Sequence, residues 1–309
     1  MAASSASRAS LAVYIKLAVV ALAFGGTFVA GRVAMQEAAP LPVATWRYVI
    51  GTVALLPLLL IREGRPALPS ARTLAAVFTM GLFAVFAYNL FFFEGLGRIH
   101  AGRAALIVGF QPALVVLGAR VLFGEALTGA RVVGCGLAIL GAGVVATRGE
   151  PGQLLAGAVG LGEILMFGAA ASFAAATLAG RHAVREISPL AAVTWQCLVG
   201  TVLLLAVGGF DATVHAPFSV NLWLLLGFMG IIGVTLTFTW YFEGVSVVGP
   251  ARAAMFMNLI PVFAVGLAHV LLGEPIDASI GVGGALVCLG VWLLNRSAKP
   301  AVARSLSQA

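Results

Sequence analysis

Long apolar stretches without a charged side chain alternate with short polar segments along the whole chain. The uncharged stretches cover residues 17–31, 73–93, 104–119, 132–147, 164–180, 187–210, 216–242, 253–268 and 278–295, and stretch 41–61 holds a single charge, Arg47. A helix that crosses the hydrocarbon core of a bilayer needs about 20 residues. The pattern therefore predicts ten membrane-spanning helices, at about 11–35, 41–61, 71–94, 102–123, 130–147, 157–181, 189–209, 220–244, 251–272 and 279–296.

The sequence repeats itself without a gap at an offset of 149 residues. Thr45-Trp46 aligns with Thr194-Trp195, and Pro112 aligns with Pro261. Each copy holds five predicted helices, so we expect two domains, residues 1–149 and 150–309. Because five is odd, the second copy enters the membrane from the opposite side. The expected fold class is an all-α polytopic membrane protein built from two inverted five-helix repeats, an arrangement typical of secondary transporters that work by alternating access.

The composition excludes an ordinary soluble domain. Charged residues make up 9% of the chain and hydrophobic residues 61%, with a mean hydropathy of +1.07, whereas soluble domains carry about 25% charged residues. The net charge of +7 comes from basic residues scattered singly, which argues against a nucleic-acid partner. The three cysteines lie inside apolar runs and show no metal-like spacing, so we expect neither a disulfide framework nor a metal site.

The distribution of Lys and Arg predicts the orientation, because cytoplasmic loops are enriched in these residues. With both termini in the cytoplasm, only Arg32, Arg98, Arg103 and Arg148 lie toward the outside. The inner side then holds most of the basic residues: Arg8, Lys16, Arg62, Arg65, Arg72, Arg120, Arg131, Arg181, Arg185, Arg252, Arg296, Lys299 and Arg304. The Ala, Gly and Arg richness suggests a bacterial source, so we expect a multi-pass protein of the bacterial inner membrane.

An ordered series of motifs recurs in both copies. In the first copy it consists of Phe93-Glu94-Gly95, the segment 101–105, Pro112, Gly124-Glu125 and a glycine-rich last helix. This order resembles the EamA domain of the drug/metabolite transporter superfamily, and the resemblance covers nearly the whole chain. It implies ten helices, cytoplasmic termini and export of small metabolites; members of the superfamily include amino-acid exporters, some of broad specificity toward aromatic amino acids.

Proline and polar residues near the middle of the predicted helices suggest a central cavity. Pro112 and Pro261 remove a backbone hydrogen bond and are expected to kink their helices, as gating points or as static bends. Polar and aromatic side chains of the first, third and fourth helices of the repeats lie at similar depth. The candidate cavity residues are Phe24, Thr27, Tyr88, Asn89, Phe92, Gln111, Trp240, Tyr241 and Asn258. Such a lining suits a zwitterion with an apolar side chain; the alternative is ordinary interhelical packing and an interfacial aromatic belt.

Charged residues inside predicted spans are candidates for function, because a charge in the membrane is costly. Arg47 has no charged equivalent in the second copy, where residue 196 is Gln. It is the first candidate for binding a substrate carboxylate or for ion coupling. We expect structural pairing of Glu94 with Arg103, and of Glu243 with Arg252, near helix ends.

Structural roles are also expected for two Gly-Glu pairs and for the glycine-rich helices. Gly124-Glu125 and Gly273-Glu274 are expected to end one helix and begin the next. The glycines of the fifth and tenth helices permit close packing between the repeats or in a dimer, so the chain is expected to be a monomer or a homodimer.

Several functions lack a signature in this sequence. No phosphate-binding loop, zinc-protease motif or nucleophile elbow occurs, so we expect no ATP-driven transport, no enzymatic site and no cofactor. The partners expected are a small-molecule substrate and the lipid bilayer. Two alternatives remain open: a multidrug or nucleotide-sugar exporter of the same fold, and a membrane-embedded enzyme or lipid scramblase.

Overall fold

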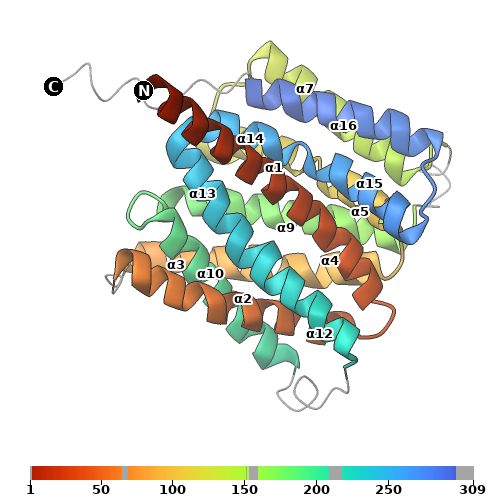
Figure 1. Cartoon of the computed structure of the whole chain (residues 1–309). Coiled ribbons are helices and arrows are strands. Elements are labelled where there is room, and N and C mark those ends of the chain that lie inside the picture. Colours follow the sequence, from red (N-terminus) through yellow and green to blue (C-terminus); the bar gives the residue numbers. More distant parts are fainter. Residues whose placement is uncertain (1, 65–68, 151, 153–158, 209–217, 297–309) are drawn as a thin grey trace.

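The computed structural model describes residues 2–64, 69–150, 152, 159–208 and 218–296, and all regular structure in these ranges is helical (Figure 1). Ten spans in these ranges are long and apolar enough to cross a membrane: Leu11–Ala34, Pro40–Glu63, Ala71–Leu96, Ala101–Phe123, Gly129–Ala146, Leu161–Ala183, Pro189–Gly208, Val220–Val248, Arg252–Leu272 and Ala278–Asn295. The ten predicted spans are thereby confirmed. The eighth is longer than expected because its helix ends only at Gly249, where φ is +88°.

The first repeat contains five spans, two of which consist of more than one helical element. Its elements are α1 (Ala2–Ala34), α2 (Pro40–Glu63), α3 (Ala71–Met80), the π-helix η1 (Gly81–Ala87), α4 (Tyr88–Leu96), α5 (Ala101–Val108), α6 (Gln111–Phe123) and α7 (Gly129–Ala146). The third span is continuous through α3, η1 and α4, whereas the fourth is interrupted between α5 and α6.

The second repeat has the same order and the same divisions. Its elements are α9 (Leu161–Ala183), α10 (Pro189–Gly208), α12 (Val220–Gly227), the π-helix η2 (Phe228–Leu236), α13 (Thr237–Val248), α14 (Pro250–Met257), α15 (Ile260–Leu272) and α16 (Ala278–Arg296). Even the two π-helices correspond, since residues 81–87 become 230–236 at the offset of 149 residues and fall inside η2. The structure therefore repeats with the same offset as the sequence.

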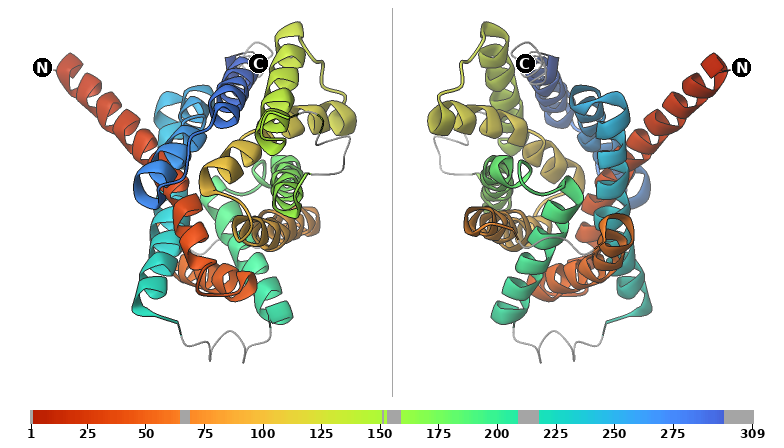
Figure 2. Two further views of the ribbon diagram at one scale, coloured as in Figure 1. Left: turned by 90° about the vertical axis from the view of Figure 1, so that its right-hand side faces the viewer. Right: turned by 90° about the vertical axis from the view of Figure 1, so that its left-hand side faces the viewer.

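Close packing of α7 on α16 joins the two repeats at one edge of the bundle (Figure 2). A Cβ atom on Gly134 would lie 2.8 Å from the carbonyl oxygen of Gly290, and one on Gly141 would lie 2.6 Å from that of Gly283. Only glycine allows backbones to approach this closely. The two contacts interchange when 149 is added to one number and subtracted from the other, as a pseudo-two-fold axis requires.

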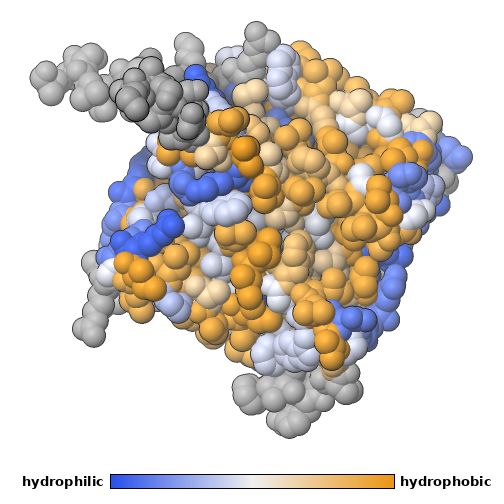
Figure 3. All heavy atoms as spheres, in the orientation of Figure 1, coloured by the Kyte–Doolittle hydropathy of each residue, from blue (hydrophilic) through white to orange (hydrophobic). Residues whose placement is uncertain are grey.

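The outer surface is apolar over a broad band (Figure 3). Large aliphatic side chains point outward, among them Ile61 and Val121, each 82% exposed, and Val270, 77% exposed. In the view of Figure 3, hydrophilic residues gather toward the left and right margins of the molecule. Exposed apolar surface on this scale suits contact with lipid rather than water.

Short local signals set the helix ends. Ser70 and Ser219 accept a hydrogen bond from the backbone N–H three residues on and so begin α3 and α12, as N-cap residues do. Gly124 and Gly273 end α6 and α15 with φ of +68° and +67°, a left-handed conformation that glycine adopts at low cost. The expected role of these two glycines is confirmed.

Candidate functional site

A buried arginine, Arg47, lies inside the bundle among aromatic rings. Arg47 is 5% exposed and lies about 10 Å along α2 from its first residue, at 1.5 Å of rise per residue. Its Nη1 donates a hydrogen bond of 3.3 Å to Oδ1 of Asn89. Its Nε is buried and has no hydrogen-bond partner. Arg47 forms no ion pair with the carboxylates of the described ranges.

Aromatic faces surround this guanidinium. Its Cζ lies 5.4 Å from the ring centroid of Tyr48, 6.0 Å from that of Phe92 and 5.9 Å from that of Phe93. These distances are typical of cation–π contacts, which partly stabilise a desolvated cation. Tyr88 stacks on Phe92 with 5.3 Å between ring centroids. We call Arg47, Tyr48, Tyr88, Asn89, Phe92 and Phe93 the arginine–aromatic cluster.

The π-helix η1 positions two members of this cluster. Tyr88 and Asn89 follow η1 directly, and Asn89 donates through Nδ2 to the carbonyl of Val85 within it, at 2.6 Å. A π-helical turn changes which way the following side chains point, and such turns are frequent at functional sites. A side chain at Gly81, the first residue of η1, would meet Val199 of α10 at 2.7 Å. Contact with α10 thus fixes the segment.

The cluster unites some of the expected cavity residues and leaves others apart. Arg47, Tyr88, Asn89 and Phe92 lie together. Phe24 instead packs edge-on against Phe238 at 5.9 Å, and the nearby Thr27 bonds back to the carbonyl of Phe24. Among the described residues, no hydrogen bond or cation–π contact joins these two residues to Arg47.

The remaining candidates lie on other elements. Trp240 lies under the ammonium of Lys16, 5.7 Å away, and Tyr241 packs on Phe242. Asn258 accepts a bond from Asn295 on α16 at 3.1 Å. Gln111 keeps a buried Oε1 without a hydrogen-bond partner.

Four aromatic residues were not among the expected cavity residues: Tyr48 and Phe93, which belong to the cluster, and Phe28 and Phe173, which pack against it. Phe28 packs edge-on against Phe92 at 5.0 Å, and Phe173 against Tyr88 at 5.7 Å. The repeat contained a signal for Phe173, since it is the equivalent of Phe24. No such signal existed for Phe28, because apolar aromatic residues in a membrane helix are common.

The two interrupted spans place both prolines at the start of a half-helix. Pro112 lies in the first turn of α6, and Pro261 lies in the first turn of α15. Their missing N–H groups are tolerated at such positions, where an N–H has no intrahelical acceptor. Each span is divided into two helices, α5 and α6 or α14 and α15, just before the turn that holds the proline. The expected kink and gating role of the two prolines stay predictions.

The expected ion pairs near the helix ends were wrong. Glu94 pairs with Arg98, one turn along on the same side of its segment, and Glu243 pairs with Lys16 of α1 at 2.6 Å. Arg103 faces α7 and α16, where it donates to the carbonyl of Val145 at 2.6 Å and pairs with Asp277 at 3.3 Å. Tertiary packing brings these side chains close to partners other than the residues nine positions away that we expected.

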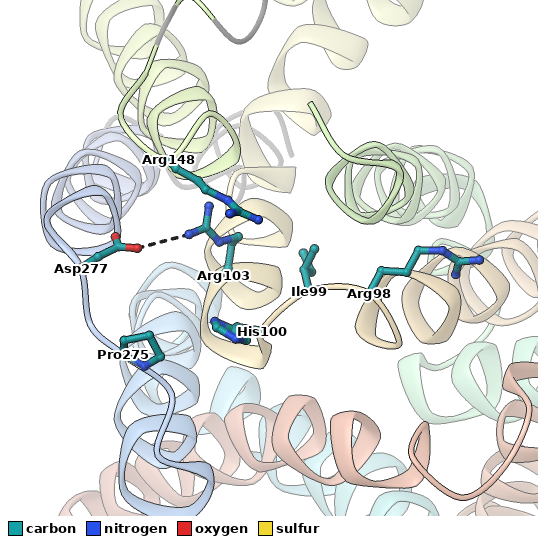
Figure 4. Close-up of a pocket in the computed structure, with 7 residues that line it drawn as sticks. All are labelled: Arg98, Ile99, His100, Arg103, Arg148, Pro275 and Asp277. Carbon is teal, nitrogen blue, oxygen red and sulfur yellow. Dashed lines mark hydrogen bonds and ion pairs between the residues drawn. The ribbon is translucent and has the colours of Figure 1, made fainter. Parts of the chain in front are cut away.

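A separate pocket of about 250 Å³ lies at the end of the bundle where α5 begins (Figure 4). Arg103 stands between Asp277 and Arg148 in this view. Partial burial opposes ionisation of Asp277, but hydrogen bonds from Ser279 and Ile280 and the charge of Arg103 together lower its pKa. The pocket is lined by Arg98, Ile99, His100, Arg103, Arg148, Pro275 and Asp277.

Comparison with known proteins agrees with the two-repeat fold. The model of the EamA-like transporter family matches twice, over residues 11–147 and 160–296. The chain belongs to the EamA-like transporter family. The resemblance and the fold class expected from the sequence are thereby confirmed. This EamA-like transporter is a multi-pass membrane protein.

Individual relatives cover most of the EamA-like transporter. The uncharacterized transporter YyaM of Bacillus subtilis is 26% identical, over 91% of this chain and 92% of its own. A probable terminal-alkyne amino-acid exporter of Streptantibioticus cattleyicolor is 30% identical, over 74% of this chain and 75% of its own. A crystal structure that is 20% identical covers 90% of this chain and 94% of its own with a TM-score of 0.61, which supports the fold alone.

Proposed function

We propose that this EamA-like transporter exports amino acids, or similar small metabolites that carry a carboxylate, across the bacterial inner membrane by alternating access. The proposal includes broad specificity with aromatic amino acids among the substrates. The observation that carries it is Arg47, a buried cation without a carboxylate partner in the described part of the chain.

Physical chemistry makes this arrangement expensive unless an anion completes it. A charge removed from water costs several kcal/mol unless it is paired and fully hydrogen-bonded. Asn89 and three ring faces offset part of that cost, but Asn89 is neutral and Nε has no partner. A substrate carboxylate would supply the missing charge and accept the free N–H.

The surroundings of Arg47 favour an apolar or aromatic side chain on the substrate. Phe92 and Phe93 are 1% and 0% exposed and offer ring faces rather than hydrogen-bonding groups. Tyr88 extends the aromatic surface toward Phe173. Aromatic faces also attract an ammonium group, so both ends of a zwitterion have a plausible environment. The Streptantibioticus relative named as an amino-acid exporter is consistent with this substrate class.

The alternatives fit the charges less well. An exporter of cations needs an unpaired carboxylate near the middle of the membrane, but Glu94 and Glu243 each pair with a basic residue. Glu163 is buried without an ion pair in the described ranges, but it lies in the first turn of α9, at the end of its span. A nucleotide-sugar carrier needs several basic groups free to bind phosphates. Arg98, Arg103 and Arg148 do line one pocket at the α5 end, but Arg98 is paired there with Glu94 and Arg103 with Asp277. Transport, rather than enzymatic chemistry or lipid scrambling, also suits two inverted repeats.

For the orientation we propose cytoplasmic termini, since most Lys and Arg residues lie at the end of the bundle where α1 begins. The breaks at Pro112 and Pro261 are proposed as hinges, because the half-helices on either side can move separately.

The test is counterflow in proteoliposomes containing the purified protein. Labelled phenylalanine should exchange with unlabelled phenylalanine and leucine. Phenethylamine, which lacks only the carboxylate, should fail to compete. In R47Q, the KM for phenylalanine should rise about tenfold or more, the effect of losing a charge-assisted hydrogen bond, while R47K should retain part of the activity.

Two results would overturn the proposal. One is an absence of counterflow with every amino acid, in protein whose folding is verified by a cooperative thermal transition. The other is equal competition by phenylalanine and phenethylamine, which would show that the carboxylate is not recognised. An R47Q variant with parental KM would remove Arg47 from the site even if amino acids are transported.

A further inference from the structure

The pseudo-two-fold relation gives each contact between the repeats an expected counterpart. Glu37 accepts hydrogen bonds from the backbone N–H and the hydroxyl of Ser219, both at 2.7 Å. The counterpart is present, since Glu186 accepts from the N–H of Ser70 at 2.7 Å and from its hydroxyl at 2.6 Å. A contact whose counterpart is missing therefore marks a place where the two halves differ in conformation.

A contact without a counterpart lies at the end of the bundle where α5 begins. The carboxylate of Glu274, which follows α15, accepts from the N–H of Ala101 at 2.8 Å and of Gly102 at 3.0 Å. Glu274 is only 9% exposed. This differs from the sequence expectation, which placed this Glu at the start of the next helix. A carboxylate at a helix N-terminus receives orphan N–H donors and a favourable dipole.

Further contacts hold α5 in the same position. The ion pair between Arg103 and Asp277 ties α5 to the loop before α16 (Figure 4). A Cβ atom on Gly109 would lie 3.0 Å from the ring of Pro261 on α15. All residues from Ala101 to Val108 are buried. This end of the bundle is shut.

The equivalent elements at the other end are apart. Glu125, the counterpart of Glu274, pairs instead with Arg181 at 2.7 Å and more distantly with Arg131 at 3.9 Å. Among the described residues, α14 packs on α13, α1 and α16 but shows no packing on α6 comparable to that of α5 on α15. Met255 of α14 is 48% exposed, although its counterpart Leu106 is 3% exposed. This end is open.

We propose that Glu274 and Glu125 are alternating latches of the transporter, a role that rests on the proposed alternating access. In the opposite state, Glu125 leaves Arg181 and accepts from the N–H of Ala251 at the start of α14. Glu274 then leaves α5 and pairs with Arg32, the counterpart of Arg181. Arg32 is available for the exchange, because it now donates to a carbonyl, that of Leu96, at 2.5 Å.

The sequence makes the two latches unequal. Pro250 stands where the first latch has Ala101, so the second latch lacks one N–H donor. Thr128 stands where the first has Asp277, so Arg252 finds no carboxylate at that position. With fewer charge-assisted hydrogen bonds available, the state open at the α14 end is the more populated one without substrate, in agreement with the structure.

Thiol accessibility in detergent tests this without any substrate. In a background with Cys135, Cys197 and Cys288 replaced by alanine, the reporters are A105C on α5 and its counterpart A254C on α14. Ala105 is 1% exposed, whereas Ala254 is half-buried. A hydrophilic maleimide should therefore label A254C faster than A105C.

Two changes should reverse this difference. E274Q places an amide NH₂ against an N–H donor, and T128D adds a carboxylate for Arg252. Each should raise the labelling rate of A105C and lower that of A254C by about tenfold, as one charge-assisted hydrogen bond implies. The control E94Q removes an ion pair at the α5 end that is not part of the latch, and should change neither rate.

Unchanged rates in both E274Q and T128D would overturn the proposal. It would also fail if E274Q raised both rates, a sign of general loosening, while T128D shifted neither. Failure of the amino-acid counterflow would leave these rates interpretable, so the latches and the substrate are judged separately.

Discussion

Thr52 and Thr201, equivalent residues of the two repeats, form a hydrogen bond between their hydroxyl oxygens at 3.0 Å. The separation of 149 residues equals the repeat offset, so this contact is its own counterpart and lies on the pseudo-two-fold axis. Thr201 donates its single proton to the carbonyl of Cys197 at 2.7 Å, which leaves Thr52 as the donor between the two hydroxyls. The bond joins α2 to α10 near the middle of both helices.

Removing the hydroxyl of Thr52 should reduce the free energy of unfolding less than removing the hydroxyl of Thr201. T52V deletes only the shared bond, so we expect a loss of about 0.5–1 kcal/mol in the free energy of unfolding. T201V also frees the carbonyl of Cys197 and strands the hydroxyl of Thr52, so we expect about 1–2 kcal/mol. Unfolding of both single variants and the double variant in detergent measures the coupling. Strictly additive losses would show that the two hydroxyls do not interact.

Two glycines of α7 should respond differently to replacement by alanine, because only one of them packs against α16. In G141A, the new Cβ atom would lie 2.6 Å from the carbonyl of Gly283 and 2.7 Å from the N–H of Val287. Since backbone atoms cannot move aside, we expect a loss of about 1–3 kcal/mol in stability. The matched control is G136A, where nothing lies within 4 Å, and helix propensity should give a gain below about 1 kcal/mol. Equal thermal transitions for the two variants would contradict the close contact.

The neutral partner of Arg47 offers a test that separates stability from transport. N89D places a carboxylate at the 3.3 Å contact, where it neutralises the buried cation and competes with a substrate carboxylate. The same substitution removes the Nδ2 donor to the carbonyl of Val85, which offsets part of the gain from neutralising the buried cation. We expect a midpoint of thermal unfolding no lower than that of the parent, together with a large rise in the KM for phenylalanine. N89L, which lacks the acceptor, should lower the thermal midpoint. Parental transport kinetics in N89D would argue against substrate binding at Arg47.

The loop after α9 should give a defined response to acid. Hydrogen bonds from the hydroxyls of Ser70 and Thr73 and from the backbone of Ser70 lower the pKa of Glu186 from 4.5 to about 2. A lowered pKa means that ionised Glu186 stabilises the fold above pH 4.5, and that this contribution is lost as the pH falls toward 2. The thermal midpoint of the parent should therefore decline over this window more steeply than that of E186Q. Parallel pH profiles would contradict the assignment.

Much of the candidate site was within reach of the sequence, but its assembly was not. Arg47 was identifiable because it is the only charge in a long apolar stretch and has Gln196 as its counterpart. Its hydrogen bond to Asn89 depends on the π-helix η1, which sets the direction of the Asn89 side chain. A π-helix has no residue type that would predict it from the sequence, because here it depends on contact with α10. The partners of Glu94 and Glu243 were missed for a related reason: each glutamate pairs with whichever basic residue the packing brings near.

The sequence by itself determined the number of spans, their order and the inverted relation of the halves. These follow from the length of apolar stretches against bilayer thickness and from an odd number of crossings per repeat. Only the tertiary structure decided which end is shut. Glu125 and Glu274 occupy equivalent positions in the sequence, but a transporter that works by alternating access cannot be open at both ends at once, so packing gives the two residues different partners.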